Sequence, residues 1–220
     1  MKTIIVKDLN EASSNCFKFI DEELSKTSSK INIALTGGRF GKFFASEIAK
    51  RELPYSRIRF FQTDERIVSF LDKECIQRMI LEELSSADNL ETFFFNLDQT
   101  ASESGNEMDA RINKYKIDKL DVVILSLGED GHLAGNFYNS RSINDRITYT
   151  NSSPKPPEKR ISFSVEWLVQ SNVVIIVALG IEKCSAINDL YQKKNGFSDL
   201  ISKSENIFLL TDQSVSSDIN

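Results

Sequence analysis

The segment Asp121–Phe137, DVVILSLGEDGHLAGNF, constrains the fold of this chain more than any other. It opens with an apolar run, Val122–Leu127, of the kind that a β-strand needs when both of its faces are buried. The run stops at Gly128, and two acids, a second glycine and the only histidine of the chain, His132, follow it. Open α/β sheets bind their ligands where such strands end. The segment therefore predicts a buried central strand with a binding site at its carboxyl end.

An earlier stretch of the chain predicts a strand, a glycine turn and a helix in direct succession. Ile31–Leu35 is a short apolar segment, and Lys42–Arg51 has apolar residues at helical spacing. The residues that connect them are Thr36, Gly37, Gly38 and Arg39. Paired glycines allow backbone N–H groups to point into one concavity at a helix N-terminus, which suits a phosphate group. A Gly-Gly turn is more often a plain loop, so this motif gains weight only beside other observations.

Strands and helices alternate along the rest of the chain. Amphipathic spacing predicts helices over Glu11–Lys26, Glu74–Leu84, Ala101–Lys116 and Glu182–Lys193, and strands over Ile58–Phe61, Phe93–Phe95, Arg160–Ser164, Val173–Leu179 and Ile207–Leu210. The proline-containing connection Asn139–Lys159 is expected to be mostly irregular, with a short strand near Ile147–Thr150, and Ser214–Asn220 to be a frayed tail. This alternation predicts one α/β domain, residues 1–220, with a mostly parallel, Rossmann-like sheet and helices on both faces.

Composition limits the partners and the compartment. The chain has 27 Lys and Arg against 32 Asp and Glu, and its net charge of -5 argues against general binding to nucleic acid or to a membrane surface. The longest apolar segment, Val173–Leu179, is too short to span a bilayer, and Lys7 and Asp8 interrupt the N-terminal apolar run before a signal sequence can form. We expect a cytoplasmic protein. The cysteines are odd in number and far apart, which predicts buried thiols without a disulfide framework or a metal site: Cys16, Cys75 and Cys184.

Polar residues gather at the ends of the predicted strands. Because the carboxyl ends of parallel strands meet at one edge of a sheet, these residues are expected to converge on one ligand. The candidates are Thr36, Gly37, Gly38, Arg39, Asp64, Arg66, Asp130, Gly131, His132 and Lys183, with Arg160 at the head of another strand. The basic side chains among them would concentrate positive charge in an acidic protein, which favours a phosphorylated small molecule. His132 beside Asp130 offers a general base and a carboxylate that orients it.

Each of these residues also has a purely structural explanation. A lone histidine is more often a structural residue than a catalyst. Lys183 on a helix and Arg160 on a strand are commonly solvated charges, and Asp64 or Glu65 can serve only to cap the following helix. The functional hypothesis therefore depends on the convergence of these residues at strand ends.

Five collinear segments of the chain resemble 6-phosphogluconolactonases, which belong to a larger group of sugar-phosphate isomerases and deaminases. The segments are Leu35-Thr36-Gly37-Gly38, Asp64-Glu65-Arg66-Ile67-Val68, Leu127-Gly128-Glu129-Asp130-Gly131-His132, Ser153-Pro154-Lys155-Pro156-Pro157 running into Arg160-Ile161-Ser162, and Leu179-Gly180 with Lys183. The resemblance covers roughly residues 31–190 in collinear order. The resemblance implies the NagB/RpiA-type architecture of that group.

The resemblance also implies an activity: hydrolysis of 6-phospho-D-glucono-1,5-lactone to 6-phosphogluconate in the oxidative pentose phosphate pathway, without a metal or an organic cofactor. His132 would be the general base that activates water, assisted by Asp130. The 6-phosphate and the rest of the substrate would be held by the Gly37-Gly38 turn, Arg66, Lys183 and Arg160, with Thr36, Arg39, Asp64 and Gly131 lining the same site. A monomer or a homodimer is expected, with no nucleic acid or membrane partner.

The chain departs from the usual sequence of the group in its loops. Arg39 stands where Ser or Thr usually follows the glycine pair, which would replace a hydroxyl contact to phosphate by a charged one. Cys75-Ile76 replaces a Ser-Asn pair. The Gly-x-Gly-Pro-Asp-Gly-His motif of the group is shortened at its start to Gly128-Glu129-Asp130-Gly131-His132. Gly135–Tyr138 replaces a Ser-Leu-Phe-Pro run. These changes alter the loops and leave the His132 and Asp130 pair in place.

Two alternative functions stay open from the sequence. Glucosamine-6-phosphate deaminases share the Asp-Gly-His motif, but they carry a glutamate five positions after the histidine, where this chain has Phe137, which cannot transfer a proton. Their Asp-Glu-Tyr motif is also Asp64-Glu65-Arg66 here. The second alternative is a non-catalytic phosphosugar-binding protein, which would bind without turnover. Phe137 and Arg66, the two differences from the deaminases, favour the lactonase over the deaminase.

Overall fold

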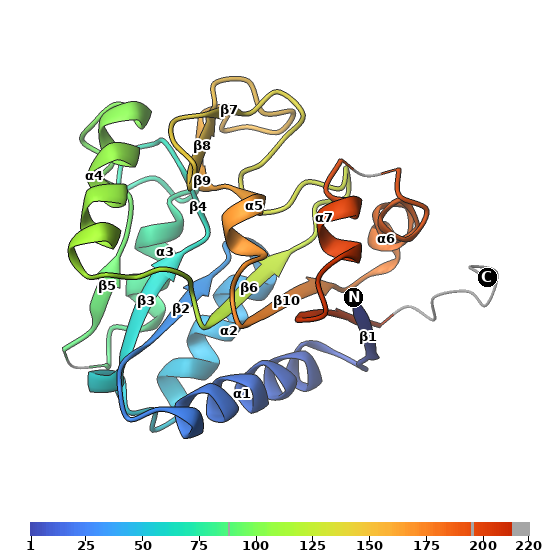
Figure 1. Cartoon of the computed structure of the whole chain (residues 1–220), viewed down its shortest axis with the longest axis horizontal. Helices are drawn as coiled ribbons and strands as arrows, with labels where there is room; N and C mark the ends of the chain where they lie inside the picture. Colours follow the sequence, from blue (N-terminus) through green and yellow to red (C-terminus); the bar gives the residue numbers. More distant parts are fainter. Residues whose placement is uncertain (88, 195, 213–220) are drawn as a thin grey trace.

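The structure is a computed structural model that describes residues 1–87, 89–194 and 196–212. A seven-stranded sheet forms its centre, and all neighbouring strands in this sheet are parallel (Figure 1). From one edge to the other the strands are β1 (Lys2–Ile5), β11 (Ile207–Thr211), β10 (Val173–Ala178), β6 (Val122–Ser126), β2 (Ile31–Leu35), β3 (Ile58–Gln62) and β5 (Glu91–Phe93). The parallel sheet predicted from the sequence is confirmed, and β6 lies at its middle.

The direction in which the chain crosses the sheet reverses between β2 and β6. From β2 the chain continues outward through β3 to β5, whereas β6 lies on the other side of β2 and leads outward through β10 to β11. Connections that leave two adjacent strands in opposite directions open a crevice at their carboxyl ends. In this chain the residues after β2 and β6 are the glycine turn and the segment that carries His132. The topology therefore brings these two motifs together.

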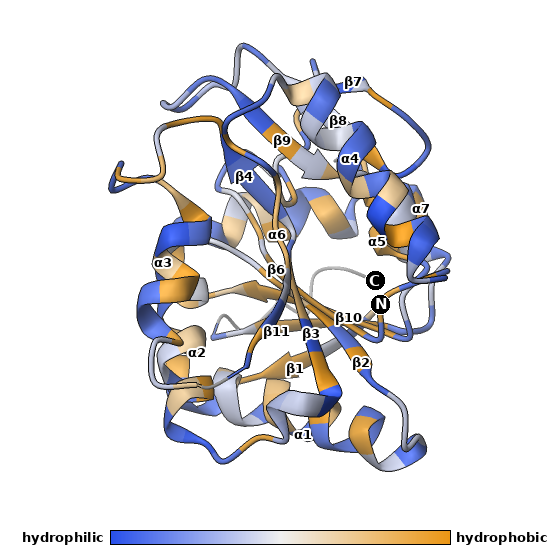
Figure 2. Ribbon diagram, turned by 90° about the vertical axis from the view of Figure 1, so that its left-hand side faces the viewer, coloured by the Kyte–Doolittle hydropathy of each residue, from blue (hydrophilic) through white to orange (hydrophobic). Residues whose placement is uncertain are grey.

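Helices cover both faces of the sheet, as predicted (Figures 1 and 2). Alternate residues of β6 show the reason, because Val122 and Ile124 belong to one apolar cluster and Val123 and Leu125 to the other. The first cluster packs under α1 (Leu9–Lys26), α2 (Gly38–Lys50) and α3 (Ile76–Glu83). The second packs under α4 (Ala101–Lys114), α5 (Val165–Leu168), α6 (Cys184–Tyr191) and α7 (Ser198–Ser202).

A second, antiparallel sheet lies beyond the carboxyl end of β3, and the sequence analysis did not predict it. Its strands, in order, are β4 (Asp64–Arg66), β9 (Arg160–Phe163), β8 (Ile147–Thr150) and β7 (Arg141–Ser142). The strand expected near residues 147–150 is confirmed. Arg160 was expected at the head of a strand, and it is the first residue of β9, which belongs to the antiparallel sheet. Arg160 pairs with Arg66 in the antiparallel sheet.

Several element boundaries differ from the prediction. The helix predicted from Lys42 begins at Gly38, directly after the glycine turn. The strand predicted over Phe93–Phe95 is Glu91–Phe93, because the backbone N–H of Phe95 donates to Gln62 Oε1 at 3.2 Å instead of continuing the ladder. The helix predicted over residues 182–193 is divided into a 3₁₀ turn, η2 (Ile181–Lys183), and α6. A further 3₁₀ turn, η1 (Tyr55–Arg57), precedes β3.

Three further expectations concern the surface of the fold. No helix in the described part of the chain is long and apolar enough to cross a membrane. Cys16 and Cys75 are buried thiols as predicted, whereas Cys184 is only half-buried. The frayed tail predicted from Ser214 lies outside the described residues.

Candidate active site

The turn between β2 and α2 presents a helix N-terminus at the carboxyl edge of the sheet. Gly37 is the N-cap residue of α2 and makes no side-chain capping bond, so no side chain of the cap residue satisfies the N–H groups of the first turn. Gly41 lets this turn approach β2, because a Cβ at Gly41 would lie 1.9 Å from the carbonyl oxygen of Thr36. The uncapped N-terminus of α2 can therefore accept an anion.

The segment after β6 folds into a tight loop that holds His132 against Asp130. The N–H of Gly128 donates to the carbonyl of His132 at 2.9 Å, and the N–H of Gly131 donates to the carbonyl of Gly128 at 3.0 Å. His132 Nδ1 lies 2.5 Å from Asp130 Oδ1. Gly128 leaves room for this pair, because a Cβ there would lie 2.2 Å from His132 Nδ1. Only glycine fits at this position without displacing the imidazole.

The environment of His132 suits proton transfer. Burial alone would raise the pKa of Asp130. The hydrogen bond from His132 and the charge of His132 together lower this pKa by more than burial raises it, so it lies below the ordinary value. Asp130 therefore stays ionised and can accept the proton on Nδ1, and in that tautomer Nε2 of the imidazole carries the lone pair that can act as a base. The imidazole ring packs on Phe137, with 4.5 Å between ring centroids. The side chain of His132 keeps 25% of its surface exposed, enough for contact with a substrate.

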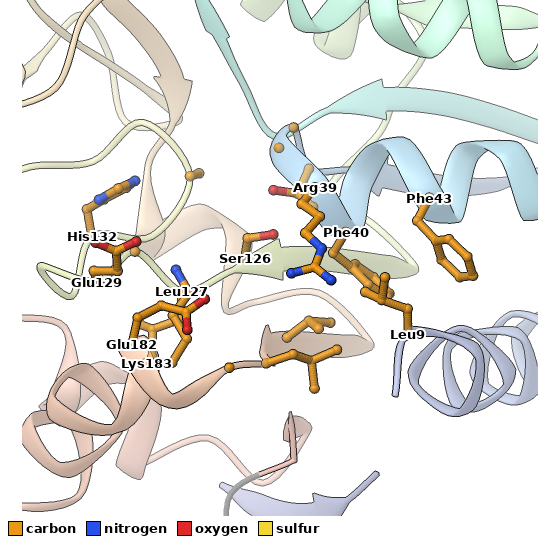
Figure 3. A pocket seen from close by; sticks show the side chains of 18 of the residues that line it. Leu9, Arg39, Phe40, Phe43, Ser126, Leu127, Glu129, His132, Glu182 and Lys183 are labelled. Atoms are coloured by element: carbon orange, nitrogen blue, oxygen red, sulfur yellow. The ribbon is translucent and has the colours of Figure 1, made fainter. Parts of the chain in front are cut away.

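A cavity of about 640 Å³ opens at the carboxyl edge between these two loops. Of the residues predicted from the sequence, those that line it are Thr36, Gly37, Gly38, Arg39, Asp64, Arg66, His132 and Lys183. Figure 3 shows Arg39 reaching into the cavity from the start of α2, with Ser126 between Arg39 and His132. Asp130, Gly131 and Arg160 do not line the cavity. Asp130 and Gly131 belong to the loop that holds His132, and Arg160 holds the proline loop beside the cavity.

The strand β4 brings Asp64 and Arg66 to the cavity. Asp64 Oδ1 accepts a hydrogen bond from the Thr63 hydroxyl at 2.8 Å. Arg66 Nη1 donates to the carbonyl of Glu74 at 2.9 Å and lies 3.2 Å from its carboxylate, while Arg66 Nε is buried without a partner in the described structure. Arg66 also lines the cavity, where its guanidinium can donate to a ligand.

Glu65, between these two residues, has a structural task. It is fully buried, and its carboxylate accepts the backbone N–H groups of Ile76 at 2.8 Å and Gln77 at 2.7 Å, at the start of α3. It also accepts the N–H of Arg66 at 2.7 Å. The helix-capping explanation considered for Asp64 or Glu65 is therefore correct for Glu65.

Arg160 does not line the cavity but holds a loop that does. It is 7% exposed, and its Nη2 donates to the carbonyl oxygens of Lys155 at 3.3 Å and Pro156 at 3.5 Å. Burial and the neighbouring charge of Arg66 lower the pKa of Arg160. The guanidinium thus anchors the proline loop, residues 153–157, next to the cavity.

The sequence analysis missed Lys155 as a site residue. Lys155 lines the cavity, and its Nζ lies 3.1 Å from Oε2 of Glu129, which also lines it. This hydrogen bond, together with the charge of Lys183, lowers the pKa of Glu129. Lys155 belongs to one of the five segments that carry the family resemblance, so the signal was present. Within the described ranges, no group of three or more His, Cys, Asp or Glu side chains could hold a metal ion.

Comparisons with known proteins agree on the relationship. The chain is 26% identical over 230 residues to the 6-phosphogluconolactonase of Borreliella burgdorferi, which covers 96% of this chain and 95% of the relative. It is 28% identical over 172 residues to that of Thermotoga maritima, with 77% and 78% covered.

Solved structures show that the fold is shared. The 6-phosphogluconolactonase of Trypanosoma cruzi superposes with a TM-score of 0.86 at 21% identity, over 99% of this chain and 96% of that chain. The Thermotoga maritima enzyme gives a TM-score of 0.80 at 22% identity, over 96% and 98%. The family model described as glucosamine-6-phosphate isomerases/6-phosphogluconolactonase matches residues 7–200, and because this range is most of the chain, the protein belongs to that family.

Proposed function

We propose that this protein is a 6-phosphogluconolactonase that hydrolyses 6-phospho-D-glucono-1,5-lactone to 6-phosphogluconate, with His132 as the general base. One observation carries the proposal: the only histidine of the chain is oriented by an ionised carboxylate and faces a cavity that also contains Arg39, Arg66 and Lys183. The names of the relatives, all 6-phosphogluconolactonases among those described above, support the same reaction.

The reaction needs one base and no cofactor chemistry. Nε2 of His132 removes a proton from water as the water oxygen bonds to the lactone carbonyl carbon, which forms a tetrahedral oxyanion. When this intermediate collapses, the bond from the former carbonyl carbon to the ring oxygen breaks, and Nε2–H returns its proton to that oxygen. The resulting carboxylic acid loses its proton to solvent. Asp130 stabilises the imidazolium between the two steps without taking its proton.

The phosphate end of the substrate is expected at the basic part of the cavity. The uncapped first turn of α2 at Gly37 and Gly38 offers backbone N–H groups, and Arg39, Arg66 and Lys183 offer charge-assisted hydrogen bonds. Anchoring the sugar by its phosphate fixes the position of the carbonyl that reacts, which lowers the entropic cost of reaching the transition state. Arg160 would act by holding the loop of Lys155 and would not touch the substrate.

Phe137 favours the lactonase over the isomerase and deaminase side of the family. Its ring packs on the imidazole of His132 and is 9% exposed, so an apolar group occupies the position where a deaminase needs a proton-transferring glutamate. A phenyl ring cannot exchange a proton. It can only restrict the orientation of the imidazole.

The decisive experiment is hydrolysis of freshly generated 6-phosphogluconolactone in buffer that contains a chelator. The lactone opens spontaneously, so the rate above the blank is the measured quantity. We expect acceleration by the wild-type protein and a loss of about a hundredfold or more in His132→Ala. Tyr138→Ala, at a position that is 93% exposed, is the control and should keep the wild-type rate.

Three results would overturn the proposal or its mechanism. A rate equal to the blank, with 6-phosphogluconate still bound in calorimetry, would indicate a phosphosugar-binding protein without turnover. Release of ammonia from glucosamine 6-phosphate would indicate a deaminase. An unchanged rate in His132→Ala would remove His132 from the mechanism even if the protein is a lactonase.

A further inference from the structure

A second cavity of about 630 Å³ adjoins the proposed active site, and it is termed here the side cavity. It lies between α2 and the segment that leads from β4 into α3. Arg39 and Arg66 line both cavities, so the two share a wall. Lys42, Lys73 and Met79 line only the side cavity. A ligand in the side cavity would therefore contact residues that the substrate site does not use.

Basic side chains outnumber acids around the side cavity. The charged residues that line it are Arg39, Lys42, Arg66 and Lys73, against Glu74 and Glu83. Glu74 pairs with Arg66 at 3.2 Å, and Glu83 approaches Lys42 only to 3.7 Å. Arg39 and Lys73 make no ion pair with any residue that the structure describes. In a protein of net charge -5, this local excess of positive charge favours an anionic ligand.

Apolar side chains also line the side cavity. Phe43 projects from α2 beyond Arg39 (Figure 3), is half-buried and belongs to neither of the two apolar clusters. Ile76 and Met79 of α3 line the same cavity. A partly exposed aromatic ring is a stacking partner for a flat heterocycle, and the flexible thioether of a methionine adapts to the shape of such a ring.

We propose that the side cavity binds an organic phosphate with a planar ring, of the nucleoside monophosphate class. The ring would stack on Phe43, and the phosphate would accept hydrogen bonds from Lys42 and Lys73, with Arg39 at the boundary to the substrate site. Arg39 lines both cavities, so a nucleotide in the side cavity and the phosphorylated product in the substrate site compete for its guanidinium. Each ligand therefore weakens the binding of the other by the same factor. Only this antagonism rests on the proposed function; nucleotide binding does not.

Titration calorimetry with adenosine monophosphate as the probe tests the proposal. We expect a Kd of about 1 mM or below, with adenosine alone and inorganic phosphate alone each about tenfold weaker or more. The double variant Lys42→Ala/Lys73→Ala should weaken adenosine monophosphate about tenfold and leave 6-phosphogluconate binding unchanged. The matched control is Lys18→Ala/Lys114→Ala, two exposed lysines outside both cavities, which should bind both ligands like the wild type.

Three outcomes would overturn the assignment. The first is no heat of binding with adenosine monophosphate at concentrations well above 1 mM. The second is an affinity that the Lys42→Ala/Lys73→Ala variant keeps. The third is equal binding of adenosine and adenosine monophosphate, which would exclude a phosphate contact. Calorimetry needs no turnover, so an absence of lactonase activity would refute the proposed function and leave this result standing. Because both lysines are exposed, the variants are expected to fold, and circular dichroism checks this.

Discussion

A methyl group added at Gly128 would lie 2.2 Å from His132 Nδ1 and 2.6 Å from Asp130 Oδ1. Both distances are far below van der Waals contact, so Gly128→Ala must separate or rotate the two side chains. We expect kcat for the lactone to fall about a hundredfold, because the imidazole loses its orientation, while the urea midpoint of unfolding changes little. Steady-state kinetics and urea unfolding of the same preparation check both statements.

Gly196→Ala is the matched control for this prediction, because a Cβ at Gly196 would have no neighbour within 4 Å. It should leave kcat unchanged. If Gly128→Ala kept the wild-type kcat, the contact between His132 and Asp130 would not matter for the reaction, and the orienting role assigned to Asp130 would fail.

At single residues, the sequence predicted side chains that follow the strands directly and was less accurate for those placed by tertiary contacts. His132 and Arg39 lie next to the ends of β6 and β2, so the position of the strand fixes them. Arg160, which the resemblance places near the substrate, belongs to the second sheet, and its guanidinium donates to the proline loop. Lys155 was missed because its place in the cavity depends on that anchored loop, which periodicity does not describe.

At the level of elements, we expect Glu65 to fix the start of α3 at Ile76. The carboxylate is fully buried and accepts N–H groups from Ile76 and Gln77. Glu65→Gln keeps the size of the side chain but turns an acceptor oxygen into a donor NH₂ group that faces N–H donors. We expect the free energy of unfolding to fall by about 2 kcal/mol, measured by urea unfolding.

The same residue predicts a pH dependence. Burial raises the pKa of the Glu65 carboxyl above its ordinary value of 4.5, although its backbone hydrogen bonds oppose this shift. Between the unfolded and the folded pKa, the folded protein therefore holds a proton that the unfolded chain has lost, so stability from this group falls as the pH rises through that window. The difference in unfolding free energy between wild type and Glu65→Gln should be largest below the ordinary pKa and shrink towards neutral pH.

Glu52→Gln, at an exposed position, is the control for both statements about Glu65 and should change the unfolding free energy by less than about 0.5 kcal/mol at each pH. A difference between wild type and Glu65→Gln that grows towards neutral pH would show that the hydrogen bonds outweigh burial, and the predicted sign would be wrong.

The elements that the sequence predicted and those that it missed differ in where their stability comes from. β2, β6 and β10 are fully or almost fully apolar and carry their own signal. β4 is Asp64-Glu65-Arg66, three charged residues that no propensity scale assigns to a strand. It is extended because β9 pairs with it and α3 needs Glu65 as a cap. The antiparallel sheet therefore follows from contacts distant in sequence, which local patterns do not record.

For the whole molecule, the two sheets share one apolar core. The cluster under α4 and α5 contains Phe61 and Val123 of the central sheet together with Ile161 and Phe163 of the antiparallel sheet. The ring of Phe163 lies 4.7 Å from that of Trp167, the only tryptophan of the chain. Because this core crosses from one sheet to the other, we propose that residues 1–220 unfold as one domain.

Unfolding of the whole chain tests this proposal, because Trp167 fluorescence reports the shared core and far-ultraviolet circular dichroism reports the helices on both faces. In urea the two signals should give one transition with the same midpoint. Phe163→Ala removes a fully buried ring and should lower the unfolding free energy by about 4 kcal/mol, moving both midpoints together. Tyr138→Ala, at a position that is 93% exposed, should move neither. If Phe163→Ala instead shifted the fluorescence transition and left the circular dichroism transition in place, the antiparallel sheet would unfold separately. The wall of the cavity that carries Arg66 and the Lys155 loop would then be a unit independent of the sheet that carries His132.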